Sequence, residues 1–495
     1  MYIKRSWIAG PHQGCLRTKL NNQVTFRPIS LEMLSLVLIG PSQYKGRNME
    51  LEKWKEKNKE SRKYAHFDEK VSLNNIWDYI SEPENIKRHG FYPFIHYEKK
   101  FNKYKKVDGI GEIQKKSRDL CYSAHVDRYI YSYYGYLINQ AYDQYMEKRN
   151  LNMVSVAYRD NLGKNNIHFA KRAFEFIKNT QDCYIIIGDF SHFFDYLEHV
   201  YLKERVREVL GVDTLPEDYY AVFKNLTRYS TWELQDLLKL NNLEETEAGI
   251  KQLNLQRRVL DTARFKANKS KYIHRHKEKY GIPQGSSMSA VLANVYMIKA
   301  DEQLNDLVTT CKGMYMRYSD DFIIVIPEIV EKQFESKLRE IQEIINRIPK
   351  LKLQQEKTQI YKYDKNQLKS CNNIFLEGVS NGKNEIDYLG FTFDGKVVTI
   401  RDKTITKYYY RLYRKAGTIV RSKGYTPKGK KISCKNLYEK YTVKGSKMKG
   451  KDGKIKGNFI TYVQRAQKIF GKEEPIDRKT RRHMLKVRRE LDKVF

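Results

Sequence analysis

Three aspartates in this sequence lie where short apolar segments end. Asp189 follows the apolar run Tyr184–Gly188, and Asp320–Asp321 form a turn between Met-Tyr-Met-Arg-Tyr and Phe-Ile-Ile-Val-Ile. Carboxylates that converge at strand ends repel one another unless a divalent cation lies between them. Two magnesium ions about 3.5–4 Å apart can activate an attacking hydroxyl and stabilise a departing pyrophosphate. An Asp-Asp dipeptide alone is more typical of ordinary turn chemistry, so the prediction rests on the order and surroundings of the motifs.

A Pro/Gly loop lies between the two carboxylate sites. The segment Gly281-Ile-Pro-Gln-Gly285 leads into an apolar run that ends at Met297. This pattern predicts a loop followed by a helix, with Ser287 or Ser289 as the N-cap. Gly285 would let the backbone approach a base pair closely. Taken alone, the segment is equally an ordinary loop–helix junction.

The elements that must position these groups follow from the apolar patterns. Residues Cys183–Gly188 predict a buried strand, Met314–Ile326 predict a hairpin, and a helix is expected from Phe193 onward. Between these, residues 210–279 predict a long, polar and mostly helical segment. Together they indicate an α/β unit with carboxylates at the ends of its strands.

Positive charge is concentrated near the C-terminal end. The chain has 93 Lys and Arg against 59 Asp and Glu, a net charge of +34, and residues 401–495 hold 30 against 8, a net charge of +22. Residues beyond Lys403 predict basic helices, interrupted by the Gly/Lys-rich loop Lys444–Gly457. Such an excess points to a polyanion, with nucleic acid as the first candidate. An acidic membrane surface is the rival, but the apolar run Leu34–Gly40 is far shorter than the about 20 residues of a membrane span.

The cysteine pattern bounds the class of protein. Six cysteines are isolated, with no CxxC pair, at positions Cys15, Cys121, Cys183, Cys311, Cys371 and Cys434. This excludes ordinary zinc fingers and gives no disulfide framework. We expect a soluble, cytoplasmic protein without membrane association.

Five motifs, in order, resemble those of reverse transcriptases. Asp189-Phe-Ser-His-Phe-Phe-Asp195 resembles the first carboxylate motif, Gly281–Asn294 the template-and-nucleotide loop, and Tyr318-Ser-Asp-Asp321 the YxDD box. Downstream, Glu356-Lys357-Thr358 resembles the motif whose lysine lies near the triphosphate, and Tyr388-Leu-Gly-Phe391 resembles the primer-grip hairpin.

This resemblance covers roughly residues 118–393 and implies an α+β right-hand polymerase. We expect a mostly helical N-terminal extension over residues 1–100 and reverse transcriptase fingers and an α/β palm over residues 101–400. A helical basic thumb with a C-terminal extension would follow over residues 401–495. Its first helix would begin at Tyr408-Tyr409-Tyr410 and lie along a duplex, where tyrosines either stack on bases or pack in the core.

The resemblance also implies roles for individual residues. Asp189 and Asp320, assisted by Asp321, would bind Mg²⁺, and Lys357 would protonate or neutralise the departing pyrophosphate. The remaining candidates would bind the nucleotide: Phe194 as the steric gate that excludes a ribose 2′-hydroxyl, Gln284 and Gly285 beside the nascent base pair, and Arg118 and Arg159 on the triphosphate. The plainer alternatives are a core aromatic for Phe194 and solvated surface side chains for Lys357 and the arginines.

Departures from the common pattern indicate the subfamily. Ser287 stands where many relatives have proline, and the segment between the first two motifs is unusually long. The sequence lacks an HNH-like endonuclease motif and the signature residues of retron enzymes. It is therefore most similar to bacterial defence-associated reverse transcriptases of the abortive-infection and unknown-group type.

That similarity implies an RNA-directed DNA polymerase of antiphage defence that uses dNTPs, makes a DNA product and works with a non-coding RNA as template or scaffold. One alternative is template-independent DNA synthesis on the same palm. Another is a maturase-like RNA-binding factor, which the intact Asp189, Asp320 and Asp321 argue against, because a binder of polyanions has no need of clustered acids. The identity of the RNA and primer stays open, as does whether the chain forms a homo-oligomer.

Overall fold

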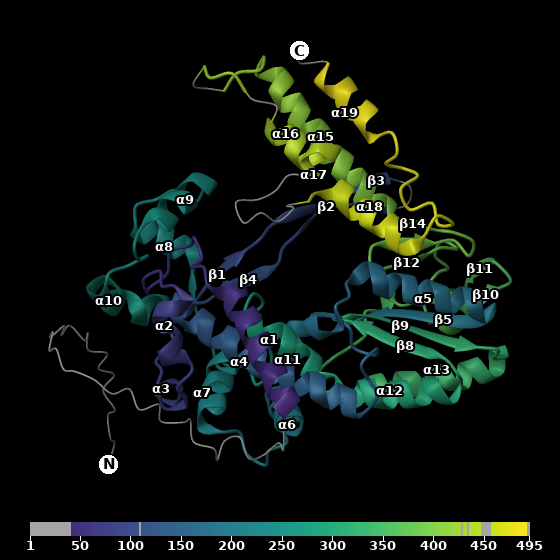
Figure 1. The fold of residues 1–495 in the computed structure, drawn as a ribbon, viewed down its shortest axis with the longest axis horizontal. Coiled ribbons are helices and arrows are strands. Elements are labelled where there is room, and N and C mark those ends of the chain that lie inside the picture. Colours follow the sequence, from purple (N-terminus) through teal and green to yellow (C-terminus); the bar gives the residue numbers. More distant parts are fainter. Residues whose placement is uncertain (1–40, 108–109, 427–428, 433–434, 447–456, 493–495) are drawn as a thin grey trace. The chain divides into compact units, whose positions relative to one another are not determined.

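The computed structural model describes residues 41–107, 110–426, 429–432, 435–446 and 457–492 (Figure 1). The chain divides into two compact units, Met1–Lys57 and Asn58–Phe495. Helix α1 (Pro41–Asn58) belongs almost wholly to the first unit, and all other elements belong to the second. Residues 58–100, which we expected in the N-terminal extension, are thus part of the larger unit.

Several segments that the sequence singled out lie outside the described residues. They are the apolar run Leu34–Gly40, the cysteines Cys15 and Cys434, and the part of the Gly/Lys-rich loop that carries Lys447, Lys449 and Lys451.

A five-stranded antiparallel sheet has the order β11-β10-β5-β9-β8, and we call it the palm after the expectation for residues 101–400. Its strands are β5 (Asp182–Asp189), β8 (Met314–Tyr318), β9 (Asp321–Pro327), β10 (Gln359–Asp364) and β11 (Gln367–Ser370). Both the predicted strand and the predicted hairpin are confirmed. The central strands are apolar on both faces because both faces of the sheet are covered by helices.

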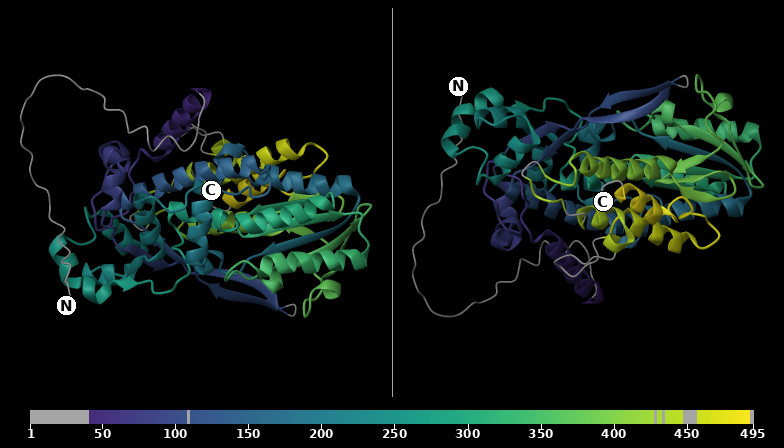
Figure 2. Two further views of the ribbon diagram at one scale, coloured as in Figure 1. Left: turned by 90° about the horizontal axis from the view of Figure 1, so that it is seen from below. Right: turned by 90° about the horizontal axis from the view of Figure 1, so that it is seen from above.

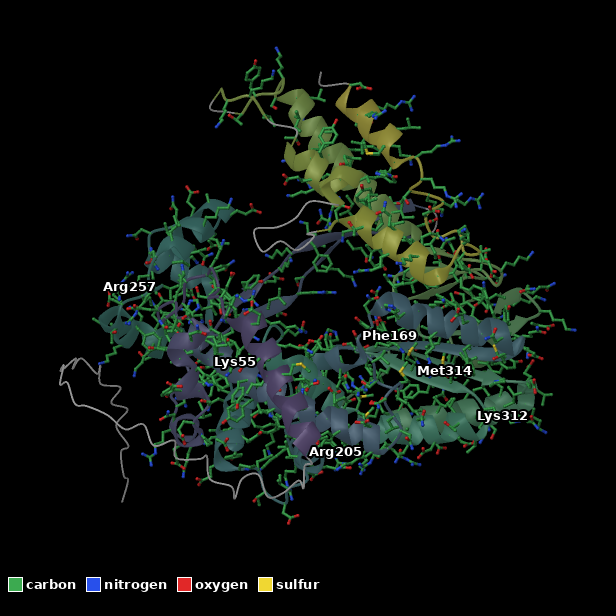
Figure 3. The ribbon with its side chains drawn as sticks, viewed as in Figure 1. Lys55, Phe169, Arg205, Arg257, Lys312 and Met314 are labelled. Atoms are coloured by element: carbon green, nitrogen blue, oxygen red, sulfur yellow. The ribbon has the colours of Figure 1, made fainter. Side chains whose placement is uncertain are left out.

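Helices α5 (Asn166–Thr180), α12 (Ile298–Thr310) and α13 (Glu331–Asn346) cover the sheet on opposite sides (Figure 1). Ala170 and Phe174 of α5 share one buried cluster with Ile185 and Ile323 of the sheet. Figure 3 shows Phe169 and Met314 inside this part of the fold, whereas Lys312 lies at its outer end.

A second sheet has four strands in the order β4-β1-β6-β7, and we call the region around it the fingers after the same expectation. Its strands are β4 (Asp119–Tyr122), β1 (Phe94–Glu98), β6 (Ser230–Glu233) and β7 (His274–Arg275), and a separate ribbon is formed by β2 (Phe101–Val107) and β3 (Ile110–Lys116). A buried cluster around Trp232 and Phe67 supports the sheet. The pairing of β1 with β6 is parallel and joins distant segments, which no local pattern indicates.

Helices make up most of the chain around this second sheet. They are α2 (Leu73–Ile80), α3 (Pro83–Lys87), α4 (His125–Lys148), α6 (His199–Leu210), α7 (Glu217–Thr227), α8 (Leu234–Leu240), α9 (Glu247–Leu255), α10 (Thr262–Tyr272) and α11 (Ser287–Tyr296). The prediction of a mostly helical segment over residues 210–279 is confirmed, with the short strands β6 and β7 in addition.

The C-terminal part begins with short elements beside the palm. They are α14 (Asn372–Phe375) and a three-stranded sheet of β12 (Ile386–Tyr388), β13 (Phe391–Phe393) and β14 (Val398–Ile400). The helices α15 (Asp402–Arg421), α16 (Lys435–Tyr441), α17 (Val443–Ser446), α18 (Phe459–Phe470) and α19 (His483–Leu491) follow. Helix α18 packs against α5, and α19 packs against α15 (Figures 1 and 2). One apolar cluster therefore runs from the palm into these helices.

Helix α15 decides between the two alternatives for the three consecutive tyrosines. Tyr408 and Tyr409 are each 7% exposed and pack in the core with Leu412, whereas Tyr410 is 62% exposed. The helix also begins earlier than expected, at Asp402. Only Tyr410 of the three is available to a partner in solution. Among the described residues, no helix is long and apolar enough to cross a membrane.

Candidate active site

The two central palm strands bring the three aspartates to one end of the sheet. Asp189 ends β5 and lies directly opposite Asp321, the first residue of β9. Asp320 occupies the tight turn between β8 and β9, and its carbonyl accepts a hydrogen bond from the Phe190 N–H (N···O 3.3 Å). Backbone pairing thus fixes the relative positions of all three residues, as the strand pattern predicts.

The electrostatics of this acidic edge, which we define as Asp189, Asp320 and Asp321, show an excess of negative charge. Burial raises the pKa of Asp321 to about 7, and the charges of Asp320 and Asp189 add to the shift. Burial also raises the pKa of Asp320, with a further contribution from Asp189. A cation near these carboxylates would relieve the repulsion.

The donor chemistry of the acidic edge fits magnesium. Carboxylate oxygens are the hard ligands that Mg²⁺ prefers, and Mg²⁺ usually combines one or two carboxylates with waters and substrate phosphates. Among the described residues, no three or more His, Cys, Asp or Glu side chains form a group that could hold a metal ion. The edge therefore suits an ion that shares its coordination with the substrate.

Lys357 lies against the acidic edge. Its Nζ donates to Oδ2 of Asp189 at 2.7 Å, and its side chain is 48% exposed. The segment before it runs along the end of β5, because the Gln354 N–H donates to the Asp189 carbonyl (N···O 2.8 Å) and the Ser191 N–H donates to the Lys352 carbonyl (N···O 2.9 Å). The lysine is thereby held beside the carboxylates while about half of its side chain stays exposed to solvent.

Phe194 and the Gly281–Gly285 loop lie together beyond β5. Phe194 is half-buried in a short 3₁₀ helix, and its carbonyl accepts from the Ile282 N–H (N···O 3.0 Å). Gln284 Nε2 donates to Oδ1 of Asp195 at 3.1 Å. Two motifs that are distant in sequence are thus joined into one surface next to the acidic edge.

Gly285 is required for packing against the fingers. Its φ is +117°, and a Cβ at this position would lie 2.2 Å from the carbonyl oxygen of Cys121. Next to it, the Cys121 N–H donates to the Gln284 carbonyl (N···O 2.8 Å). The close approach that we expected toward a base pair is made here toward strand β4.

The predicted N-cap of α11 is wrong. The helix starts at Ser287, its N-cap is Ser286, and the Ser286 side chain makes no capping hydrogen bond. The hydroxyl of Ser289 instead donates to the Pro283 carbonyl (O···O 2.8 Å). Ser289 therefore stabilises the loop before α11, and neither Ser287 nor Ser289 caps the helix.

With this geometry in place, comparison with known proteins decides the family. The family of reverse transcriptases (RNA-dependent DNA polymerases) matches residues 137–393, which is more than half of the chain. The chain belongs to the reverse transcriptase family. No protein of curated function matches the sequence.

Among solved structures, this reverse transcriptase is similar to yeast telomerases. Telomerase from Candida albicans, solved in complex with a TWJ fragment of telomeric RNA, is 12% identical, with 85% of this chain and 65% of that chain covered and a TM-score of 0.37. Apo telomerase from Candida tropicalis truncated from the C-terminal domain is 14% identical, with 67% and 61% covered and a TM-score of 0.36. The chain spans less than two thirds of each of these telomerase chains.

The two arginine candidates for the triphosphate differ in placement. Arg118 is exposed, with its guanidinium 5.7 Å from the centre of the Phe101 ring. Arg159 is 3% exposed, and its Nε donates to Oδ1 of Asp143 at 2.6 Å. Its Nη1 also donates to the Asn152 and Ser155 carbonyls. The assignment of Arg159 to the triphosphate is therefore corrected, because its guanidinium is buried and already paired.

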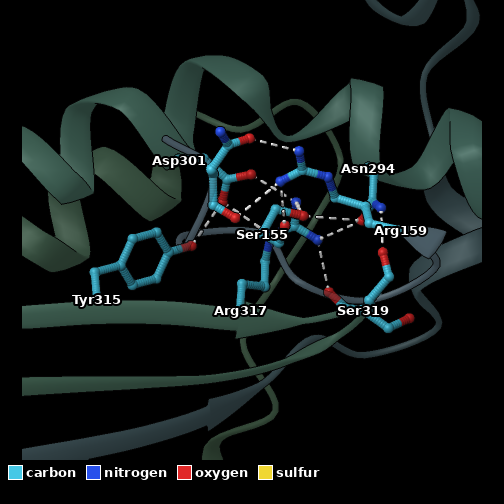
Figure 4. A network of polar contacts seen from close by, with 9 residues as sticks. Ser155, Arg159, Asn294, Asp301, Tyr315, Arg317 and Ser319 are labelled. Atoms are coloured by element: carbon cyan, nitrogen blue, oxygen red, sulfur yellow. Dashed lines mark hydrogen bonds and ion pairs between the residues drawn. The ribbon is translucent and has the colours of Figure 1, made fainter. Parts of the chain in front are cut away.

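The sequence analysis missed Arg317, which lies just before the Ser319–Asp321 turn (Figure 4). Arg317 and Asp301 are both fully buried, and they form a two-pronged ion pair with Nε–Oδ1 at 2.8 Å and Nη2–Oδ2 at 2.6 Å. The available signal was a charged residue within an otherwise apolar strand, since a buried charge needs a partner. Nothing in the sequence pattern identified Asp301, on α12, as that partner.

Proposed function

We propose that this reverse transcriptase is a magnesium-dependent, RNA-directed DNA polymerase that acts in bacterial antiphage defence with a specific non-coding RNA as template or scaffold. The observation that carries the polymerase proposal is the pairing of Asp189 with Asp321 across β5 and β9, with Asp320 in the adjoining turn. Intact catalytic carboxylates on a reverse transcriptase palm support a working enzyme. The defence role is supported by the motif pattern of the sequence alone.

Each side chain around the acidic edge has a proposed part in the reaction. Asp189, Asp320 and Asp321 hold Mg²⁺, which when bound supplies the activation of the primer 3′-hydroxyl and the stabilisation of the departing pyrophosphate. Lys357, whose Nζ lies 2.7 Å from Asp189, neutralises or protonates that pyrophosphate. Its ion pair with Asp189 keeps it within reach of the leaving group.

Selection and binding of the nucleotide fall to the neighbouring surface. Phe194, which is half-buried and lies five residues after Asp189, is the proposed steric gate, because a bulky side chain there would exclude a ribose 2′-hydroxyl and favour dNTPs. Gln284, held by Asp195, contacts the nascent base pair, with Gly285 shaping the loop. Arg118 remains the proposed contact of the fingers with the triphosphate.

The basic face of α15 is the proposed contact with the RNA-containing duplex. We define this face as Lys403, Lys407, Arg411 and Arg414, which are all exposed and follow one another at helical spacing around the exposed Tyr410. The opposite side of α15 is buried against the core, so the orientation of the basic face is fixed. Regularly spaced cations on a fixed helix suit the phosphate backbone of a duplex.

The test is nucleotide incorporation by the purified full chain. The protein is assayed with each dNTP in Mg²⁺, before and after nuclease treatment removes co-purified RNA, and again with a defined RNA template and DNA primer. We expect a DNA product complementary to the RNA, with no product from the Asp320→Asn variant. Product that persists without any RNA would favour template-independent synthesis, and RNA retention without product would favour the RNA-binding factor.

The defence role needs its own test. Cells that carry the wild-type gene in its natural context should lower the plating efficiency of at least one phage, and cells that carry the Asp320→Asn variant should not. Equal protection by both proteins would contradict a role for DNA synthesis in defence.

A further inference from the structure

The turn that presents Asp320 is held in an unfavourable backbone conformation. Ser319 has a φ of +65°, in the left-handed region that non-glycine residues rarely adopt. A turn of this kind persists only where surrounding groups hold it. The groups that contact Ser319 therefore help to determine the position of the Asp320 carboxylate.

Two contacts with residues outside the turn hold Ser319 in place. Its carbonyl accepts a hydrogen bond from Nη1 of Arg317 at 2.8 Å, and its hydroxyl lies 3.1 Å from the hydroxyl of Tyr158. The first contact is buried, because Arg317 is 0% exposed and Ser319 is 5% exposed. Buried hydrogen bonds from a charged donor are the stronger kind.

The guanidinium of Arg317 is itself fully constrained (Figure 4). Its five N–H groups have acceptors, which are both oxygens of Asp301, Oδ1 of Asn294 at 3.3 Å, Oγ of Ser155 at 3.0 Å and the Ser319 carbonyl. Tyr315 adds a hydrogen bond from its hydroxyl to Oδ1 of Asp301 at 2.8 Å. A lysine has three donors and no planar fork, so it cannot reproduce this set of contacts.

The backbone of Arg317 is fixed as well. Its N–H donates to the Val154 carbonyl (N···O 2.7 Å), and its carbonyl accepts from the Val156 N–H (N···O 3.0 Å). Residues from the loop after α4, from α11 and from α12 thus converge on one arginine. Because all of its N–H groups are hydrogen-bonded, the guanidinium connects the turn firmly to helices α11 and α12.

A second buried arginine provides an internal comparison. Arg159 forms a buried ion pair with Asp143 and donates to the Ser155 carbonyl, so it belongs to the same polar region. None of its described hydrogen bonds reaches Ser319 or the acidic edge. The two pairs are alike in burial and chemistry and differ in their contact with the catalytic turn.

We infer that Arg317, anchored by Asp301, is a positioning residue of the polymerase site: its guanidinium holds the Ser319 carbonyl and thereby fixes the turn that presents Asp320. This inference rests on the proposed function for its effect on catalysis. Its structural part concerns the turn alone and stands without any metal or substrate.

The experiment compares Arg317→Lys with the matched control Arg159→Lys in the full chain. Hydrogen exchange of the Tyr318–Phe322 segment is measured in metal-free protein, together with the thermal midpoint, and then kcat and KM for dNTP are measured in Mg²⁺. For Arg317→Lys we expect faster exchange of this segment and a kcat lower by about 100-fold, since small misplacements of a catalytic group have effects of that size. The KM for dNTP should stay within about threefold, because the variant removes no nucleotide contact.

The control variant separates positioning from stability. Arg159→Lys should lower the thermal midpoint about as much as Arg317→Lys, because both disturb a buried ion pair, and should leave the exchange of the turn and kcat nearly unchanged. Equal losses of kcat in the two variants, or unchanged exchange of the turn in Arg317→Lys, would overturn the inference.

A milder variant serves if Arg317→Lys does not fold. Ser155→Ala removes the hydroxyl that accepts from Nη2 of Arg317 and keeps the carbonyl that Arg159 uses. Faster exchange of the turn in this variant would support the inference, and unchanged exchange would overturn it. If the wild-type protein incorporates no nucleotide, the proposed function fails, while the exchange measurement still tests the positioning of the turn.

Discussion

The acidic edge of the palm and the basic face of α15 carry opposite charges, and their charged side chains also differ in how they are positioned and in how far they are exposed to solvent. Asp189 and Asp321 are fixed by strand pairing and are partly withdrawn from water, so their electrostatic interactions are strong. The basic face is exposed along a single helix, where solvent and salt screen each charge. The acidic edge therefore depends on the position of individual atoms, and the basic face depends on the sum of its charges.

This difference predicts how many side chains must change before function is lost. At the acidic edge, one carboxylate oxygen should matter. On the basic face, the loss of one cation should change RNA binding little, whereas the loss of all four together should weaken it.

The largest effect is expected at the acidic edge. Asp320→Asn and Asp189→Asn should each lower nucleotide incorporation by about 1,000-fold or more, since the amide cannot replace an anionic ligand of a catalytic ion. The fold and RNA binding should be preserved, because the side-chain volume hardly changes. Single-turnover primer extension, circular dichroism and RNA binding check this prediction.

Asp213→Asn is the control, because Asp213 is exposed in the segment between α6 and α7. Near-wild-type turnover of either acidic-edge variant in Mg²⁺ would contradict the assignment of the metal ligands.

The next effect concerns selectivity for the sugar. Phe194→Ala should raise the incorporation of ribonucleotides relative to deoxynucleotides by about 10- to 100-fold, because removing the ring opens space beside the 2′-carbon. Competition assays with paired rNTP and dNTP substrates measure the ratio. Tyr196→Ala, at the exposed end of the same short helix, should leave the ratio unchanged. The same ratio in wild type and Phe194→Ala would make Phe194 a packing residue.

On the basic face, the expected effect of a single change is small. Replacing Lys403, Lys407, Arg411 and Arg414 together by glutamine should weaken RNA binding by about tenfold or more and flatten its dependence on salt, because fewer counterions are released. Each single replacement should cost about twofold. Binding titrations between low and high salt measure both quantities.

A charge-matched control is available on the palm. The same replacement of Lys332, Lys337 and Arg339 on α13 and of its C-cap residue Arg347 changes the net charge equally on a different surface. If both quadruple variants lost the same affinity, the interaction would follow net charge and not the face of α15.

The smallest effect is on stability in the absence of metal. Because burial and the neighbouring acids raise the pKa of Asp321 to about 7, the folded protein binds a proton that the unfolded chain has already lost. This contribution is complete at low pH and is lost as the pH rises through about 7. It should lower the free energy of unfolding by about 1 kcal/mol between pH 6 and pH 8, which is about 2 °C in the thermal midpoint.

Thermal unfolding in EDTA at pH 6, 7 and 8 checks this sign. Other groups also titrate in this range, so the difference between wild type and Asp321→Asn isolates the carboxyl group. The variant should lose less stability than wild type as the pH rises, and Mg²⁺ should reduce the loss in wild type alone. An identical pH dependence of the two proteins would contradict the electrostatic picture of the acidic edge.

The elements around the acidic edge could be predicted from sequence because their signals are local. An apolar β-branched run ending in Asp189 and a hairpin with a Ser-Asp-Asp turn each have a recognisable pattern. The sheet then brings their ends together without further information. The roles of Asp189, Asp320 and Asp321 followed from the order of the motifs and remain to be tested.

The structural features that the sequence could not predict depend on contacts between distant segments. Arg159 and Arg317 look alike in the sequence, and only the fold shows that both are buried and which aspartate pairs with each. For Tyr408 and Tyr409 the sequence left base stacking and core packing open, and only the fold shows that both pack in the core. Gly285 was expected near a base pair, and its close contact is with Cys121.

The most direct test of the central claim is the sequence of the DNA that the purified protein makes on a defined RNA template as Mg²⁺ is titrated. The account predicts no incorporation in EDTA, incorporation that rises with Mg²⁺, and a product complementary to the template that the Asp320→Asn variant does not make. A product unrelated to the template, or synthesis that continues without a divalent ion, would contradict it.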